Sequence, residues 1–329
     1  MRLQILINHH KEPIEIIRRL LDSIDRQTGI DGRGIEILIC TDGEEYRLHD
    51  NAFAGLKTMI RYFVMPHRGV CATRNTLLDL SDADYLMFCD CDDMFSGTDG
   101  LKKLIDAALR NDADIVGSDY DIEHNIDGEL VHCPCRRDIK RVHGKIFRRD
   151  YLIEQNIRYP DEMLFSGDMY FLYLAYHLTD RIVWLPDNFY VWKWMPESVT
   201  RGKTHYSVRT YDRFNQCYVL VIKELKRRGL TDLYYDTLAA RIAGSYIDWY
   251  SDKFLSAPAD ISDQAKHAII ETVKEFSDEF FTIPDKIRHK VYINLLLSRR
   301  TYGPPGKYAG LDEWIKEVTQ EVVNPGENM

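Results

Sequence analysis

Long apolar runs are absent from this chain of 329 residues. No stretch approaches the roughly 18 consecutive apolar residues that a membrane-spanning helix requires. A secretory leader is not evident either, because the apolar segment that follows Arg2 is too short for the hydrophobic region of one. We therefore expect a cytoplasmic protein without a transmembrane segment.

Basic residues and paired cysteines are also scarce. Lys and Arg number 43 against 52 Asp and Glu, and the net charge of −9 argues against a general polyanion binder, so nucleic acid is not an expected partner. The seven cysteines are an odd number, which favours reduced thiols over a disulfide framework. Cys133 and Cys135 resemble half of a zinc site, but no second pair follows at suitable spacing. Because the net charge is negative, any phosphate-binding site must be confined to one part of the surface.

An alternation of strands and helices fills the chain from residue 1 to about 120, which is typical of a doubly wound parallel sheet. The predicted strands are short apolar runs: Arg2–Ile7, Ile35–Cys40, Met59–Met65, Tyr85–Cys89, Asp114–Gly117 and Ile182–Leu185. From about residue 205 the apolar spacing predicts amphipathic helices only. We expect a Rossmann-like α/β domain with a mainly parallel sheet at 1–204 and an all-helical region at 205–329.

The run Tyr85–Asp93 is the most informative segment, because an apolar strand leads directly into Asp90, Asp92 and Asp93. Three carboxylates a few ångströms apart repel one another by roughly 1 to 4 kcal/mol per pair. A divalent cation reverses that repulsion, and oxygen ligands suit Mg²⁺ or Mn²⁺. The alternative is an acidic loop that caps the following helix.

Polar segments follow four of the predicted strands. They are Asn8–Lys11, Thr41–Gly43, His67–Gly69 and Asp90–Asp93. The carboxyl ends of parallel strands share one edge of a sheet, so these segments are expected to converge on one crevice, as a nucleotide site requires. The alternative is that they are the ordinary polar loops of an α/β protein.

Several further segments occur in a fixed order. Gly69–Thr76 has a Gly-hydrophobic-small-Ala-small-Arg-Asn pattern, and Asp84–Asp93 is a strand that ends in Asp-x-Asp-Asp. A Lys-hydrophobic-aromatic-Arg-Arg block lies in His143–Leu152, and an acidic motif in Phe165–Phe171. Tyr190–Arg201 adds an aromatic block that ends in Ser-hydrophobic-Thr. In this order the segments resemble the inverting family 2 glycosyltransferases with the GT-A fold, over roughly residues 2–201.

The resemblance implies a metal-dependent enzyme that transfers a sugar from a nucleotide-sugar, most simply a UDP-sugar, to a hydroxyl of a glycan or lipid-linked acceptor. Asp168 would be the general base, although an Asp at a helix start is equally an N-cap residue. Mn²⁺ or Mg²⁺ would be held by Asp90, Asp92, Asp93 and His205. The residues implied in nucleotide-sugar binding are Asn8, His10, Glu12, Asp42, Arg68, Arg74, Asp90, Cys91, Lys193 and Arg201.

Three departures from the family pattern stand out. Asn8–Glu12 follows the first strand where the family usually has Pro-x-Tyr-Asn, and Thr41 precedes Asp42 where a second Asp is common. Gly167 stands where the acidic motif usually has Glu. The first two departures concern the contacts to the nucleotide base, and the third concerns the acceptor side.

Two other functions stay open. A sugar nucleotidyltransferase would need a Gly-rich phosphate loop after the first strand, and Asn8–Glu12 contains no glycine. A non-catalytic module would bind a cation through the acidic cluster and would not need Asp168. The helical region at 205–329 is expected to shape the acceptor site or a homodimer contact. A lipid-linked acceptor would require peripheral association at the inner membrane face.

Overall fold

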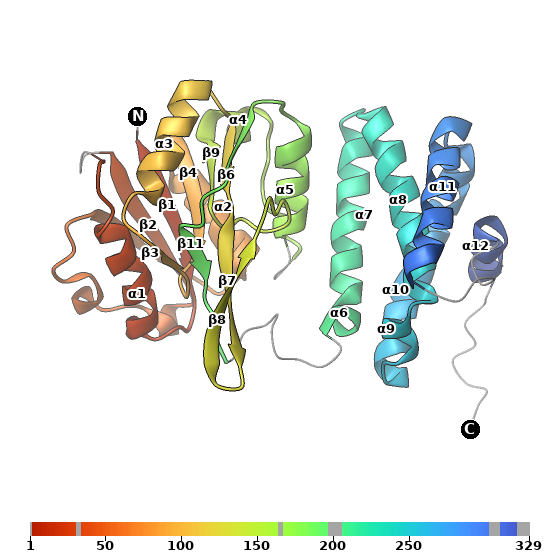
Figure 1. Ribbon diagram of the computed structural model, residues 1–329, viewed down its shortest axis with the longest axis horizontal. Helices are drawn as coiled ribbons and strands as arrows, with labels where there is room; N and C mark the ends of the chain where they lie inside the picture. Colours follow the sequence, from red (N-terminus) through yellow and green to blue (C-terminus); the bar gives the residue numbers. More distant parts are fainter. Residues whose placement is uncertain (1, 31–33, 164–166, 197–205, 303–309, 321–329) are drawn as a thin grey trace. The chain divides into compact units, whose positions relative to one another are not determined.

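The computed structural model describes residues 2–30, 34–163, 167–196, 206–302 and 310–320 (Figure 1). The chain divides into two compact units, Met1–Ser198 and Val199–Met329. The first unit is an α/β structure, and the second is helical. Among the described residues, no helix combines the length and the apolar character that crossing a membrane requires.

A seven-stranded sheet forms the centre of the first unit, in the order β10-β6-β9-β4-β1-β2-β3. Its strands are β1 (Leu3–His9), β2 (Ile35–Asp42), β3 (Met59–Met65), β4 (Tyr85–Asp90), β6 (Ile115–Ser118), β9 (Lys145–Arg148) and β10 (Ile182–Leu185). Neighbouring strands pair in parallel except β9, which is antiparallel to both β4 and β6. The predicted mainly parallel sheet flanked by helices is confirmed, whereas the antiparallel β9 was not predicted.

Helices cover both faces of this sheet. α1 (Ile14–Asp25) and α3 (Gly100–Asn111) share one apolar core with Leu3, Ile5 and Ile7 of β1. Successive residues of a strand point to opposite faces, so Leu6 lies on the other face. The elements of that face are α2 (Val70–Leu80), which contacts β1 and β2, and α5 (Asp168–His177), whose Phe171 ring packs against Phe88 of β4. The short α4 (Arg149–Glu154) follows β9 directly.

A second, four-stranded sheet has the order β5-β11-β7-β8. It consists of β5 (Met94–Phe95), β11 (Tyr190–Trp192), β7 (Tyr120–Ile126) and β8 (Glu129–Cys135). β7 and β8 form the long hairpin at the bottom of the view in Figure 1, and its turn lies at Asn125–Gly128. Because β5 follows β4 closely, this sheet brings β11 to the acidic end of β4.

The second unit is built from helices that bury one another's apolar stripes. They are α6 (Tyr206–Arg209), α7 (Tyr211–Arg227), α8 (Thr231–Trp249), α9 (Asp252–Leu255), α10 (Ala259–Thr282), α11 (Asp285–Tyr302) and α12 (Leu311–Gln320). α7, α8 and α10 contact one another, and they bury Val221, Leu238 and Ile269 among others. The predicted helical C-terminal region is confirmed.

Gly117 of β6 offers a test of the packing between β6 and β10. It lies opposite Trp184 of β10, and a Cβ at this position would overlap the Trp184 ring, whose Nε1 donates a 2.6 Å hydrogen bond to Asp119. We expect Gly117→Ala to lower the free energy of unfolding by about 1–3 kcal/mol, as overpacking does. Urea unfolding followed by circular dichroism measures the change.

Gly244 of α8 provides the matched control, because a Cβ there meets no atom within 4 Å. Gly244→Ala should leave the free energy of unfolding unchanged or raise it by up to about 1 kcal/mol, since Ala favours a helix over Gly. Equal unfolding curves for wild type and Gly117→Ala would contradict the packing described for Trp184.

Candidate active site

The candidate active site lies where the carboxyl ends of β1, β2 and β4 meet. Asn8, near the end of β1, is in register with Cys40 of β2 on one side and with Asp90 of β4 on the other. The polar segments that follow these strands are therefore neighbours, which confirms the convergence predicted from the sequence. In open α/β sheets, ligands bind at such an edge.

A buried arginine links the elements at this edge. Arg74, in the middle of α2, donates to Asp90 Oδ1 at 2.6 Å, to Asp168 Oδ1, and to Asn8 Oδ1 at 3.3 Å. Its guanidinium carbon lies 5.2 Å from the centre of the Tyr159 ring. Burial by itself would lower the pKa of Arg74, but Asp168 and Asp90 raise it well above its usual range. Arg74 is therefore a fixed positive charge between two carboxylates.

Asp168 is the first residue of α5, and Gly167 occupies the N-cap position. The Asp168 carboxylate accepts hydrogen bonds from Arg74 and from the backbone of Val142. Burial raises the pKa of Asp168, and the attraction to Arg74 opposes that rise without cancelling it. The structure therefore places this carboxylate in contact with Arg74 rather than in the N-cap position.

The carboxylate of Asp92 stands close to the carboxylates of Asp90 and Glu12. Burial raises the pKa of Asp90, but Arg74, His143 and Asn8 together hold it below its usual range. Burial, Asp90 and Glu12 outweigh the attraction of Arg19 and raise the pKa of Asp92 to about 7. Mg²⁺ or Mn²⁺ bound at the Asp92 carboxylate would relieve this repulsion, because both ions bind carboxylate oxygens.

Asp93 and Cys91 point into the protein and are buried. Asp93 accepts hydrogen bonds from the Tyr190 hydroxyl at 2.7 Å and from the Lys193 backbone at 3.0 Å, and so ties the end of β4 to β11. Burial, Asp92 and Asp90 raise the pKa of Asp93 well above its usual range. Burial, followed by Glu12 and Asp92, likewise raises the pKa of the Cys91 thiol.

His143 forms a second group with Asp90 and Asp93, in which one potential ligand atom from each residue lies within 4.8 Å of the others. Its Nδ1 is 3.5 Å from Asp93 Oδ2, and its ring stacks against the rings of Tyr190 and Trp192. Burial lowers the pKa of His143 to about 3, so the imidazole is neutral. The sequence did not identify His143 as a site residue, because it follows no predicted strand.

Four other residues were predicted to bind the nucleotide-sugar or the metal: Lys193, Arg68, Arg201 and His205. Lys193 pairs with the buried Glu123 of β7, which also accepts from His132 Nε2 at 2.9 Å. Arg68 is exposed, and its backbone rather than its side chain contacts Asp42. Arg201 and His205 lie outside the described residues.

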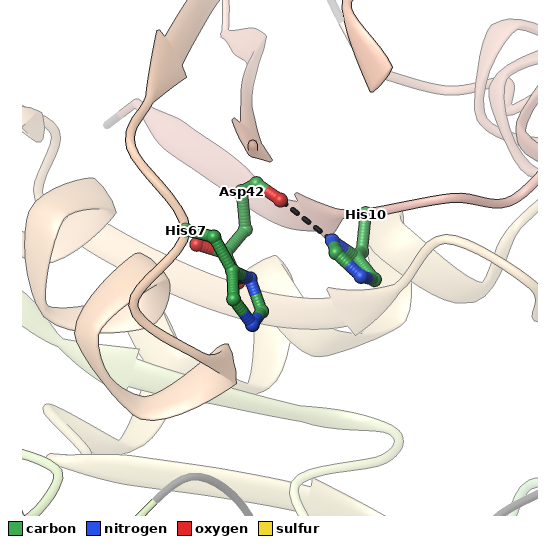
Figure 2. A group of neighbouring side chains, drawn as sticks. All are labelled: His10, Asp42 and His67. Carbon is green, nitrogen blue, oxygen red and sulfur yellow. Dashed lines mark hydrogen bonds and ion pairs between the residues drawn. The ribbon is translucent and has the colours of Figure 1, made fainter. Parts of the chain in front are cut away.

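Asp42, at the end of β2, is held by the segment that precedes α2. Its two carboxylate oxygens accept from the backbone N–H groups of Arg68 at 2.7 Å and Gly69 at 2.9 Å. His67 Nδ1 lies 2.8 Å from Asp42 Oδ2, and His10 Nδ1 lies 2.6 Å from the Asp42 carbonyl oxygen (Figure 2). The sequence indicated His67 only as part of a polar segment after the third strand.

Packing explains why residue 167 is a glycine. A Cβ at this position would lie 2.5 Å from Cys71 Sγ and 3.2 Å from Pro160 Cδ. Cys71 belongs to the first turn of α2 and is fully buried, so it has no room to move away. The residue next to Asp168 must therefore be glycine in this packing.

Comparison with known proteins gives a family and a fold. The family model described as glycosyl transferase family 2 matches residues 5–172. The uncharacterized glycosyltransferase EpsJ of Bacillus subtilis (strain 168) is 26% identical over 206 residues, which cover 56% of this chain and 59% of EpsJ. This chain thus matches less than two thirds of the length of EpsJ.

Solved structures of S. aureus TarS 1-349 share the fold. The complex with UDP-GlcNAc has a TM-score of 0.67 and the complex with UDP one of 0.65, both at 16% identity. The matches cover 91% of this chain and 92% and 91% of the two TarS chains. At this identity the likeness establishes the fold alone.

The first prediction for the site concerns the charge of Arg74. Arg74→Met leaves the half-buried carboxylates of Asp90 and Asp168 without their shared cation, so we expect the free energy of unfolding at pH 7 to fall by up to about 3–5 kcal/mol. The loss should shrink towards pH 4, because protonation neutralises the two carboxyls. Urea unfolding at both pH values measures it.

Arg47→Met is the control for Arg74→Met. Arg47 pairs with Glu44 at 2.6 Å on the surface, where an ion pair contributes less than about 1 kcal/mol. Equal losses in the two variants, or a loss at Arg74 that does not depend on pH, would contradict the bridging role of Arg74.

The second prediction concerns the pH dependence of cation binding at Asp92. Because the pKa of Asp92 is raised to about 7, this carboxyl is protonated below that pH, and a cation must then displace the proton. We expect the affinity for Mn²⁺ to fall by up to about tenfold per pH unit below pH 7 and to level off above it. Calorimetric titration between pH 5.5 and 8.5 measures this, and Asp92→Asn should bind weakly with a flatter profile. A wild-type affinity that stays constant over this range would rule out Asp92 as the titrating ligand.

Proposed function

The chain belongs to glycosyl transferase family 2, and on this basis we propose that it transfers a sugar from a nucleotide-sugar to a hydroxyl group with inversion at the anomeric carbon. The observation that carries the proposal is the pair of carboxylates, Asp90 and Asp168, on either side of Arg74. Asp90 ends a strand at the ligand-binding edge of the sheet, and Asp168 begins a helix that packs on the same sheet. In this arrangement the nucleotide-sugar would bind on the side of Asp90 and the acceptor hydroxyl on the side of Asp168, with the fixed charge of Arg74 between them.

Asp168 is proposed as the general base. An acceptor hydroxyl must lose its proton as it attacks the sugar, and a carboxylate with a raised pKa is a stronger base than an exposed one. Arg74 holds Oδ1 of Asp168, which fixes the direction of the carboxylate. A single displacement that uses one base inverts the anomeric centre.

The donor phosphates are proposed to lie against Asp90 and Asp92, with Glu12 close by. These residues would hold Mn²⁺ or Mg²⁺, and a cation bound there would stabilise the negative charge that develops on the leaving diphosphate. Asp93 contributes by fixing the end of β4 through Tyr190 and the backbone of Lys193. Each of its oxygens accepts one of these hydrogen bonds and keeps a further acceptor position, so Asp93 could also contribute to binding the cation.

A UDP-sugar is the proposed donor, and the UDP and UDP-GlcNAc complexes of TarS, which has the same fold, support this choice. The uracil base of the donor would lie near Asp42 and His10, at the ends of β2 and β1. A glycan or a lipid-linked molecule is the proposed acceptor, and the helical unit is proposed to contribute to acceptor binding or to a homodimer. The nucleotidyltransferase alternative has no supporting observation, since the segment after β1 lacks the glycines of a phosphate loop.

The experiment is release of nucleoside diphosphate from UDP-, GDP- and dTDP-sugars by the full chain, with and without Mn²⁺. We expect one donor class to be hydrolysed slowly in a metal-dependent way, because water substitutes for the acceptor. Asp168→Asn should lower the rate by about 10²–10⁴-fold while UDP binding is retained.

Asp150→Asn is the matched control, because Asp150 is an exposed carboxylate in the first turn of α4. It should leave both the rate and UDP binding unchanged. Turnover of Asp168→Asn at the wild-type rate would eliminate the general-base assignment. Absence of both turnover and metal-dependent nucleotide binding would favour a non-catalytic module.

A further inference from the structure

Lys145 is a buried lysine to which the proposed mechanism gives no role, although it opens the Lys-hydrophobic-aromatic-Arg-Arg block of the sequence. It is the first residue of β9 and is 0% exposed. Its Nζ donates to the carbonyl oxygens of Arg141 at 2.7 Å and His143 at 3.1 Å. The ring centres of Trp184 and Tyr120 lie 5.4 and 5.9 Å from Nζ. Because a buried charge is costly unless polar groups compensate it, the interaction with these two carbonyls is a strong one.

The chain turns back on itself between His143 and Lys145. Gly144 has a φ of +65°, a backbone conformation that glycine adopts readily. This turn lets the Lys145 side chain reach carbonyls two and four positions earlier. The Gly144 carbonyl accepts from the backbone N–H of Ser118 at 2.9 Å and from the Ser118 hydroxyl at 3.0 Å. The segment 141–145 is therefore anchored to β6 as well as to Lys145.

The peptide group between Arg141 and Val142 links Lys145 to Asp168. Its carbonyl accepts from Lys145, and its N–H, which belongs to Val142, donates to the Asp168 carboxylate. The carbonyl and the N–H of a trans peptide lie in one plane and point in opposite directions. Lys145 and Asp168 therefore lie on opposite sides of a single peptide group. A cation at the carbonyl polarises this group and strengthens its N–H as a donor.

Two groups thus fix the direction of the Asp168 carboxylate. Arg74 donates to Oδ1, and the Val142 N–H supplies a second hydrogen bond. The Asp168 side chain is 23% exposed, so an acceptor hydroxyl can reach it from solvent. Lys145 has no exposed surface and cannot touch a substrate. It can therefore affect the reaction only through its neighbours, of which this peptide group contacts Asp168.

We propose that Lys145 is a positioning residue for the general base, and that it holds Asp168 in its reactive orientation through the Arg141–Val142 peptide group. The inference rests on the proposed function, which assigns the general base to Asp168. The proton of the acceptor hydroxyl passes to Asp168 as before, and Lys145 exchanges no proton with the acceptor. A neutral side chain at 145 would leave the Arg141 carbonyl without its donor, and the Val142 N–H would be free to turn away from Asp168.

The kinetic test compares Lys145→Met with the wild type in the release of nucleoside diphosphate by the full chain. We expect kcat to fall by about 10–100-fold, because a carboxylate displaced by as little as about 1 Å loses its alignment with the attacking oxygen. KM for the nucleotide-sugar should stay within about twofold, since the donor contacts proposed at Asp90 and Asp92 are unaltered. Circular dichroism checks the fold. If Lys145→Met does not fold, Lys145→Gln keeps one neutral donor and should change kcat in the same direction.

A double variant separates positioning from a general structural effect. If Lys145 acts through Asp168, then Lys145→Met added to Asp168→Asn should lower kcat no further, whereas independent effects multiply. A loss in the double variant equal to the product of the two single losses would overturn the proposal. Wild-type kcat in the folded Lys145→Met variant would overturn it as well.

A second measurement does not depend on turnover. The amide proton of Val142 is bonded to a carboxylate, so it should resonate downfield in the ¹H–¹⁵N spectrum of the full chain. Both Lys145→Met and Asp168→Asn should move this signal upfield, and an unchanged signal in Lys145→Met would contradict the proposal. Absence of wild-type turnover would overturn the proposed function instead, and the Val142 signal alone would then decide whether Lys145 holds Asp168.

Asp114→Asn is the control for the loss of a buried charge. Asp114 is 3% exposed, and its carboxylate lies 3.2 Å from Arg148 Nε. Arg148 pairs with Tyr85 at the start of β4, so Asp114 stands at the end of the sheet away from the acidic run. Asp114→Asn should lower the stability of the protein and leave kcat and the Val142 signal unchanged.

Discussion

The placement of one positive charge inside the protein governs the architecture of the active site. Arg74 meets Asp90 from β4 and Asp168 from α5, so a helix and a strand that are distant in sequence are joined to α2 through a single guanidinium. Burial of any one of these charges alone would be costly, and together they neutralise one another. The three elements are therefore electrostatically interdependent.

The distribution of charge at the end of β4 explains why a bound cation would be stabilising there. Arg74 forms ion pairs with Asp90 and Asp168. Asp93 accepts hydrogen bonds from the Tyr190 hydroxyl and from the Lys193 backbone. Asp92 is left with Glu12 and Asp90 as like-charged neighbours, and Arg19 offsets their effect only in part. The unmet charge is thus concentrated on one carboxylate rather than shared by the whole acidic run.

The sequence predicted most of the sheet and the acidic edge, because both depend on local patterns. β1 to β4 are apolar runs with polar residues at their ends, and their parallel pairing follows from the helices between them. The antiparallel β9 escaped prediction, because pairing partners of Lys145–Arg148 are set by contacts distant in sequence. The partners of Asp93 and Lys193 were missed for the same reason: Tyr190 lies 97 positions beyond Asp93, and Glu123 lies 70 before Lys193.

The contact between Cys71 and Gly167 constrains how the chain can diverge. Cys71 fills the space that a side chain at 167 would occupy, so the two positions are epistatic. An acidic residue at 167 would therefore require a smaller residue at 71 or a shift of α2. With Cys71 retained, a side chain at 167 would overlap it beside Asp168. Cys71, nearly a hundred positions earlier in the chain, therefore restricts which residue can stand at 167, next to the proposed general base.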